Sequence, residues 1–528
     1  MDSLITIIDE LRKERGRGND SLLYKLTEYD EIMDYARVIG IDMNDIERKV
    51  REISGLYLAD LDNINIDDKL RNKFKLELLY KKGYLLVSEN EGVLDVVTYK
   101  LVDGGRKELV EFIGKQGYSI RLSFCFECLL NKWLYETGQI YKFIDVKDID
   151  VNDFVDNVIK IGIANRASDI HIEPQKRTIR VRYRVDGELT SLIEIEKDLD
   201  MYSNFISRIK ILSNLDIAES RKPQDGSIVD FSYMGKTFDI RVSTVATVLG
   251  EKVVMRLLNK NEGLLDFKQL GFEEDEEKVV KSILSNTSGI VLLTGATGSG
   301  KSTTLYTMMD YVNREGINVS TIEDPVEKTI DGINQVQVSE YVKQSEILKS
   351  FLRQDPDVIV VGEIRDSETA ELAVKAAMTG HLVIATIHAK NTQEIPSRLE
   401  NLGVERYLIA NTSVGYLSQR LIRRVCNHCK HKYKPSEEEL KWLRDVCKIA
   451  GLDIPDELYI GRGCKECNWT GYRGRQALVE VIEVSDEVRE KILNKDDFIN
   501  KYALWVSACK KIIRGDTTIS EVMRVLKG

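Results

Sequence analysis

The order of apolar and polar residues changes character twice along the 528-residue chain. Up to about residue 145 the chain is highly charged and mostly helical in pattern. Leu70, Phe74 and Leu78 recur there every four residues, as on one face of a helix, and a strand-like YLLVSE follows. Residues 1–145 therefore predict a small amino-terminal α/β or helical module with a regulatory or docking role.

A second pattern covers residues 150–258. The segment FVDNVIKIGIANRA has helical spacing, and strand-like segments follow it. In TIRVRYRV apolar residues alternate with Arg180, Arg182 and Arg184, and FDIRVST repeats this alternation with Arg241 on its polar side. This part of the chain predicts a small α+β domain whose sheet has one arginine-rich face.

The third pattern, over residues 272–528, alternates short apolar strands with longer helical stretches. The strands GIVLLTG, NVSTIED, DVIVVGE and HLVIATI are separated by spacers of crossover length. Such spacing is typical of a parallel sheet covered by helices on both faces. The fold class predicted for the chain is thus multidomain α/β.

Composition narrows the class of protein further. Acidic residues exceed basic residues by 86 − 76 = 10, which argues against a surface that tracks nucleic acid along its whole length. No apolar run approaches the roughly 20 residues of a membrane-spanning helix. The start, MDSLITIIDELRKERG, lacks a signal-peptide core. We expect a cytoplasmic chain with at most peripheral membrane association and no direct nucleic-acid partner.

The strongest chemical motif follows the strand 290–294 and has the form G-x-x-x-x-G-K-[ST]. Such a loop points backbone N–H groups at phosphates, while its lysine reaches the β- and γ-phosphates and its hydroxyl binds Mg²⁺. A glycine-rich turn that binds nothing is the alternative. The residues predicted to bind ATP are Gly295, Ala296, Thr297, Gly298, Ser299, Gly300, Lys301, Ser302 and Thr303.

Three further groups stand at the carboxyl ends of predicted strands, where parallel sheets bind ligands. Glu323 and Glu363 are candidates for orienting the attacking water, and His388 for sensing the γ-phosphate. Gly362 stands where many phosphate-loop enzymes have an aspartate, so direct Mg²⁺ binding by that strand is in doubt. Each of the three also has a purely structural interpretation.

The arginines of the second region allow two interpretations. Arg180, Arg182 and Arg184 either form a solvated face balanced by nearby carboxylates or belong to a phosphate-binding surface. Arg241 and Arg256 are the preferred candidates for stabilising a phosphoryl-transfer transition state.

Four of the eight cysteines form two Cys-x-x-Cys pairs, Cys426/Cys429 and Cys464/Cys467. Four thiolates in this spacing predict a closed tetrahedral Zn²⁺ site within an insertion at 426–467, with a folding or docking role. An iron–sulfur site and free thiols are the alternatives. A third pair, Cys125 and Cys128, has no second half, and we interpret it as buried packing.

Several of these segments, taken in order, resemble a known family. TGATGSGKSTTLY, TIEDPVE, LRQDPDVIVVGEIRD and TGHLVIATIHAKN resemble the Walker A, Asp box, Walker B and His box of secretion-type hexameric ATPases. ASDIHIEP, RYRVDG, RKPQDG and RVSTVATVLGEKVVMRLL resemble the PAS-like domain that precedes that core. The tetracysteine insertion narrows the resemblance to type IV pilus assembly (extension) ATPases and type II secretion ATPases.

The resemblance implies a RecA-like core in a homohexamer, with ATP and Mg²⁺ held between that core and the arginine-bearing domain. It also implies an inner-membrane platform protein as the partner and pilin subunits as the indirect cargo. One departure is Ser227, which stands where the family often has an arginine after PQDG. The amino-terminal region also lacks a clear cyclic-dinucleotide motif.

The function predicted from these features is a motor ATPase that powers type IV pilus assembly at the inner face of the cytoplasmic membrane. A type II secretion motor and a DNA-uptake pilus motor are variants of the same prediction. A DNA-translocating ATPase and a nucleotide-gated scaffold without turnover are alternatives from other classes.

Overall fold

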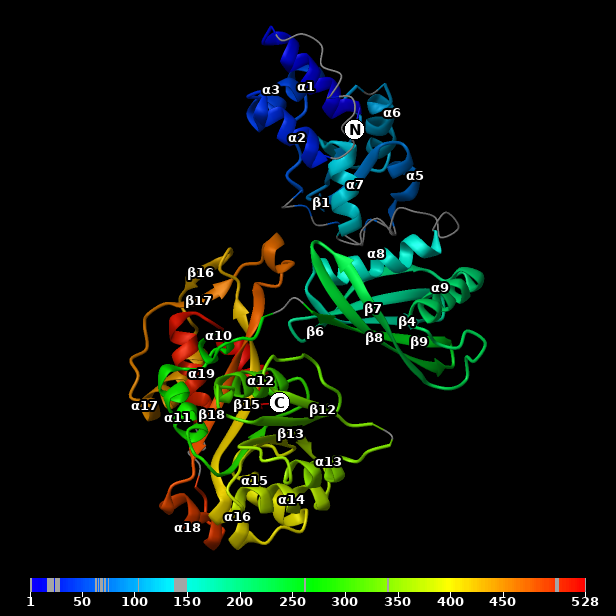
Figure 1. The fold of residues 1–528 in the computed structure, drawn as a ribbon. Helices are drawn as coiled ribbons and strands as arrows, with labels where there is room; N and C mark the ends of the chain where they lie inside the picture. The colour runs from blue at the N-terminus through cyan, green and yellow to red at the C-terminus, as the bar shows by residue number, and fades with distance from the viewer. Residues whose placement is uncertain are drawn as a thin grey trace. The chain divides into compact units, whose positions relative to one another are not determined.

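The structure, a computed structural model, describes residues 2–16, 23, 29–61, 64, 66, 70, 73, 74, 76–102, 104–136, 150–260, 263–339, 341–498 and 503–527. The chain forms two compact units, Met1–Asn261 and Glu262–Gly528 (Figure 1). Each unit has its own sheets and hydrophobic cores.

The first unit begins with helices and a small sheet. Three helices share a core with Phe124 and Phe126. Leu70 and Phe74 are buried, as the periodicity predicts, whereas the side chain of Leu78 lies outside the described residues. The elements are α1 (Asp2–Glu14), α2 (Tyr29–Val38), α3 (Met43–Ser54), α5 (Leu76–Lys81), β1 (Tyr84–Asn90), β2 (Val93–Thr98), α6 (Arg106–Gly114), β3 (Ser119–Phe124) and α7 (Glu127–Glu136).

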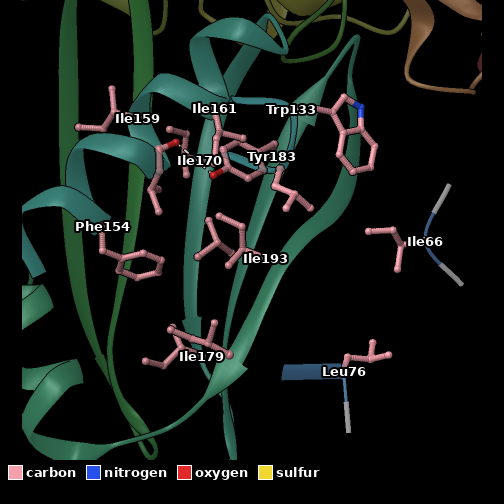
Figure 2. Close-up of a cluster of buried hydrophobic side chains, with 14 of the residues drawn as sticks. Ile66, Leu76, Trp133, Phe154, Ile159, Ile161, Ile170, Ile179, Tyr183 and Ile193 are labelled. Carbon is pink, nitrogen blue, oxygen red and sulfur yellow. Dashed lines mark hydrogen bonds between the residues drawn. The ribbon is translucent and has the colours of Figure 1, made fainter. Parts of the chain in front are cut away.

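The same unit contains a six-stranded antiparallel sheet of order β6-β5-β4-β9-β8-β7. Phe154 and Ile161 of α8 belong to one buried cluster with Ile170 and Tyr183 of the sheet, and Ile161 lies beside these two sheet residues in Figure 2, so α8 helps to cover the apolar face. The elements are α8 (Val151–Ala164), β4 (Ala167–Pro174), β5 (Thr178–Val185), β6 (Glu188–Glu196), α9 (Leu199–Leu212), β7 (Gln224–Tyr233), β8 (Lys236–Thr247) and β9 (Gly250–Asn259).

The alternation predicted for residues 178–185 is confirmed. Ile179, Val181 and Tyr183 are each 0% exposed, and the Tyr183 hydroxyl donates to the Val158 carbonyl oxygen across 3.1 Å. The arginines between them consequently occupy the opposite face, because successive side chains of a strand point to opposite sides.

The second unit is built on a seven-stranded sheet of order β12-β11-β13-β14-β10-β15-β18. All neighbours pair in parallel except β15 and β18, which are antiparallel. Helices cover both faces, with α11 and α12 in one core and α13, α14, α15 and α16 in the other. The predicted α/β class is therefore confirmed.

The strands of this unit are β10 (Gly289–Thr294), β11 (Val319–Glu323), β12 (Asn334–Gln337), β13 (Val358–Ile364), β14 (Leu382–Ile387), β15 (Ser413–Val425), β16 (Lys430–Tyr433), β17 (Leu458–Gly461) and β18 (Tyr472–Glu483). Its helices are α10 (Phe267–Leu270), α11 (Glu274–Leu284), α12 (Lys301–Val312), α13 (Gln344–Phe351), α14 (Ser367–Met378), α15 (Glu394–Asn401), α16 (Arg406–Thr412), α17 (Glu437–Ala450), the 3₁₀ turn η5 (Lys465–Cys467), α18 (Asp486–Asn494), α19 (Ala503–Arg514) and α20 (Ile519–Lys527).

A buried ion cluster joins the start of this unit to its carboxyl-terminal helices. Lys511 and Arg514 of α19 bind the Glu273 carboxylate, with N···O distances of 3.0 Å and 2.7 Å. Burial raises the pKa of Glu273, but the Arg514 hydrogen bond and the Lys511 charge outweigh it and bring the pKa to about 2. The cluster therefore stabilises the fold only while Glu273 is ionised.

We predict that Glu273→Gln lowers the free energy of unfolding by about 3 kcal/mol, because it leaves the buried Lys511 without its charge partner. The folded pKa lies below the unfolded value of about 4.3, so the wild type loses this stabilisation as pH falls from about 5 to 2. Thermal unfolding across pH measures both effects. Glu274→Gln, at an exposed neighbouring carboxylate, is the matched control, and equal midpoints for the two variants contradict the prediction.

Candidate functional site: a phosphate loop and a cysteine cluster

The predicted phosphate loop connects β10 to α12, as its motif requires. Gly298 and Gly300 have φ values of +76° and +85°, a left-handed region that favours glycine. A Cβ atom on Gly295 would lie 2.6 Å from the carbonyl oxygen of Gln419, so β15 packs directly against the loop. The loop is held in a curled shape that a larger residue at position 295 would disturb.

Lys301 begins α12 and points back into the loop. Its Nζ atom donates to the carbonyl oxygens of Gly295 and Ala296 across 2.7 Å and 3.1 Å. Burial lowers the pKa of this ammonium group, and the Glu363 charge raises it while the Arg420 charge lowers it. The exposed Ser302 follows at the positive end of the helix dipole, where anions bind readily.

Glu363 and His388, chosen separately from the sequence, form one cluster. Their Oε1 and Nε2 atoms are 2.6 Å apart at the carboxyl ends of β13 and β14. Arg365 completes the cluster by binding Glu363 across 2.8 Å and Asp324 across 3.0 Å. Arg365 was not predicted from the sequence, although its position directly after β13 and two residues after Glu363 was a signal for this site.

Glu323, the other candidate acid, has a different environment. It is 5% exposed, and its carboxylate accepts hydrogen bonds from Tyr306, from Thr321 across 2.7 Å and from Gln335 across 3.0 Å. Burial and the Glu323 carboxylate raise the pKa of Tyr306. Glu323 is thus almost fully buried, and its hydrogen bonds connect three neighbouring side chains.

The backbone explains the glycine that precedes Glu363. A Cβ atom on Gly362 would lie 3.0 Å from the Ile322 carbonyl oxygen in the neighbouring strand β11. The Gly362 carbonyl oxygen also accepts a hydrogen bond from Thr386 across 2.6 Å. An aspartate at position 362 would therefore require the adjacent backbone to move by a few tenths of an ångström.

Arginines on the polar face of the six-stranded sheet form ion pairs, among them Arg180, Arg182 and Arg256. Arg256 binds Asp169 across 3.0 Å and lies in register with Arg241 on the neighbouring strand. Among the described residues, Arg241 has no acidic ion-pair partner, and Ser227 lies opposite it on β7. Arg180 and Arg182 both bind Glu173, so those two arginines match the balanced-face interpretation.

The four cysteines of the two Cys-x-x-Cys pairs converge, although they are far apart in sequence. Their sulfur atoms all lie within 4.8 Å of one another, and the Cys426–Cys464 and Cys429–Cys467 distances are both 3.8 Å. A tetrahedral site with Zn–S bonds of ~2.3 Å has sulfur–sulfur edges of ~3.8 Å. The arrangement therefore fits the predicted Zn²⁺ ligand set.

Close backbone packing shapes the cysteine cluster. A Cβ atom on Gly461 would lie 2.1 Å from the Gly471 carbonyl oxygen, so only glycine fits there. Cys467 Sγ accepts hydrogen bonds from the backbone N–H groups of Cys464 and Gly471 across 3.2 Å and 3.3 Å. Elsewhere, Cys125 is 2% exposed, which confirms buried packing for it, while the Cys128 side chain lies outside the described residues.

Comparisons with known proteins place this geometry in a family. The model of the family "Type II/IV secretion system protein" matches residues 145–524. The chain is 39% identical over 392 residues to type II secretion system protein E of Pseudomonas aeruginosa, covering 72% of this chain and 76% of that protein. It is 44% identical over 353 residues to type IV pilus assembly ATPase PilB of Thermus thermophilus, covering 66% of this chain and 39% of that protein.

A solved structure, that of the Yersinia pseudotuberculosis ATPase DotB, matches with a TM-score of 0.52 at 20% identity. It covers 72% of this chain and 95% of that chain, which supports the fold alone. The chain belongs to the type II/IV secretion system protein family, as the resemblance predicted, and it is an ATPase of that family. No helix among the described residues is long and apolar enough to cross a membrane.

We predict that the purified protein contains about one zinc ion per chain and that Cys426→Ser removes it, because three thiolates no longer close the tetrahedron. Elemental analysis by mass spectrometry measures the metal content. Cys447→Ala, at a buried cysteine outside the cluster, is the control and is expected to keep its zinc. Iron in the wild type, or an absence of metal, would show that the cluster is not a zinc site.

Proposed function

We propose that the chain is a cytoplasmic motor that hydrolyses ATP to ADP and phosphate and powers type IV pilus assembly at the inner face of the cytoplasmic membrane. The proposed working form is a homohexamer that acts on an inner-membrane platform protein and, through it, on pilin subunits. The observation that supports hydrolysis best is the placement of the phosphate loop and the Glu363–His388 pair at one edge of a parallel sheet.

In this proposal the backbone N–H groups of residues 295–303 and the Lys301 ammonium group bind the triphosphate. Lys301 is pre-positioned because its carbonyl partners belong to the loop itself. The hydroxyl of Ser302 would hold Mg²⁺, which would neutralise charge on the β- and γ-phosphates when bound. These roles follow the general chemistry of phosphate loops.

The two candidate acids take different roles. Glu363 is partly exposed, with 21% of its side chain accessible, and we assign to it the orientation and deprotonation of the attacking water. His388 and Arg365 hold the carboxylate from two sides, which fixes its direction. Glu323 is assigned the organisation of this edge, because its hydrogen bonds tie α12 to the end of β11.

Arg241 and Arg256 are proposed to stabilise the transition state of ATP hydrolysis at a phosphate loop of the hexamer. Arg241 is the stronger candidate, since Arg256 is already paired with Asp169. The cysteine cluster would hold Zn²⁺ and supply rigidity, since four protein ligands leave no coordination position for a substrate.

We put pilus assembly first on the 44% identity over 353 residues with the Thermus pilus ATPase. Across the relatives the two groups overlap, because pilus ATPases are 37–44% identical to the chain and type II secretion proteins 38–41%. A type II secretion motor remains the second candidate, since the chain covers 76% of that relative and only 39% of the pilus ATPase. Complementation of strains lacking either motor distinguishes the two functions.

We predict that Lys301→Ala reduces ATP hydrolysis to background and weakens nucleotide binding at least about tenfold, because the phosphates lose a charge-assisted partner. Steady-state phosphate release and binding of a fluorescent ATP analogue measure the two effects. Lys278→Ala, on the exposed side of α11, is the matched control. Hydrolysis at the wild-type rate by Lys301→Ala would contradict the site.

Glu363→Gln and Glu323→Gln are predicted to differ in kind. Glu363→Gln lowers kcat by about a hundredfold or more and leaves the affinity for ATP nearly unchanged, since glutamine has the shape of glutamate but cannot act as a base. The second lowers the thermal midpoint together with kcat, because a buried hydrogen-bond network is disturbed. A kcat for Glu363→Gln close to the wild-type value would show that another residue is the general base.

A further inference from the structure

Arg420 lies beside the phosphate loop on strand β15. The parallel pairing of Thr294 with Ser418 brings the next residues of β15 alongside the start of the loop. Gln419 fixes this contact, because its Nε2 atom donates to the Ser299 carbonyl oxygen across 2.8 Å and its Oε1 atom accepts from Thr304 across 2.7 Å. The backbone next to Arg420 is therefore held against both the loop and α12.

Within the described part of the chain, the guanidinium group of Arg420 has only carbonyl partners. It donates to the Gln419 carbonyl oxygen across 3.0 Å and to the Lys390 carbonyl oxygen across 2.7 Å. No carboxylate of the described residues lies within ion-pair distance of it. By contrast, Arg423 on the same strand binds Glu521 across 2.7 Å. A half-buried cation without an ion-paired acid is unusual, since desolvation of charge is costly.

Two cations thus flank the first residue of the loop. Arg420 donates to the Gln419 carbonyl oxygen. This oxygen lies directly against Gly295, since a Cβ atom on Gly295 would be only 2.6 Å from it. Lys301 donates to the Gly295 carbonyl oxygen. The two positive charges repel each other, and each lowers its free energy if an anion binds between them.

Glu480 is the acid that acts electrostatically on Arg420 among the residues that the structure describes, and it is a weak counter-charge. Glu480 on β18 is 4% exposed, lies opposite Ser418, and has an Oε1 atom without a hydrogen-bond partner among the described residues. Burial raises the pKa of Glu480 to about 7, with Thr392 and Arg420 opposing the shift. Burial likewise lowers the pKa of Arg420, as expected for a cation that lacks a full counter-ion.

We propose that Arg420 is a second cationic ligand for the phosphate chain of the nucleotide, supplied by the same chain as the phosphate loop. The inference rests on the proposed ATP site and adds a residue that the loop motif does not contain. A planar guanidinium suits this role, because it forms two parallel hydrogen bonds to phosphate oxygens. Phosphate oxygens would replace one or both carbonyl partners that Arg420 has in the structure.

The test is the Kd for a fluorescent ATPγS analogue with Mg²⁺, measured by anisotropy on the full chain. Arg420→Gln is expected to raise the Kd about ten- to a hundredfold, because it removes a charge-assisted pair. Arg420→Lys keeps the charge and is expected to bind more tightly than the glutamine variant. Arg424→Gln, at an exposed arginine on the same strand, is the matched control and is expected to bind as the wild type does.

The dependence of the Kd on the charge at position 420 distinguishes a phosphate ligand from a residue with a purely structural role. A Kd for Arg420→Gln within about threefold of the wild type overturns the proposal, and so does equal binding by the lysine and glutamine variants. Either result leaves the proposed function intact, provided that the wild type binds the analogue. If the wild type itself does not bind it, the nucleotide site fails and the role of Arg420 fails with it.

Discussion

The site depends on the parallel pairing of β10, β11, β13 and β14. Parallel strands end at the same edge of a sheet, so the groups that follow them meet even when they are far apart in sequence. The phosphate loop follows β10, Glu363 lies at the end of β13, and His388 follows β14. Antiparallel pairing of one of these strands would move its group to the opposite edge.

Buried polar contacts hold this edge in place behind the exposed groups. Tyr306 and Glu323 connect α12 to the end of β11, and Gln419 connects β15 to the loop. Such networks are costly when only partly satisfied, so each partner restricts the others to one arrangement. In the proposed mechanism, this rigidity keeps Lys301 and Glu363 in fixed positions without reorganisation during the reaction.

The sequence predicted the parallel strands, the loop and the convergence of four cysteines, because apolar runs and fixed spacings are local signals. It missed β15 and β18 as partners of the sheet, since the polar Ser418, Gln419 and Arg420 interrupt the apolar pattern of β15. It also did not distinguish whether Glu323 or Glu363 orients the attacking water. Their different burial is set by residues distant in sequence, and no local pattern encodes it.

The most direct test of the proposed nucleotide site is an experimental structure of the chain with Mg²⁺ and a non-hydrolysable ATP analogue. We expect triphosphate oxygens within hydrogen-bond distance of the 295–302 backbone N–H groups, with Glu363 facing the γ-phosphate through a water and Glu323 still hydrogen-bonded to Tyr306. A nucleotide bound away from this edge would contradict it. So would a γ-phosphate that faces Glu323 while Glu363 points away.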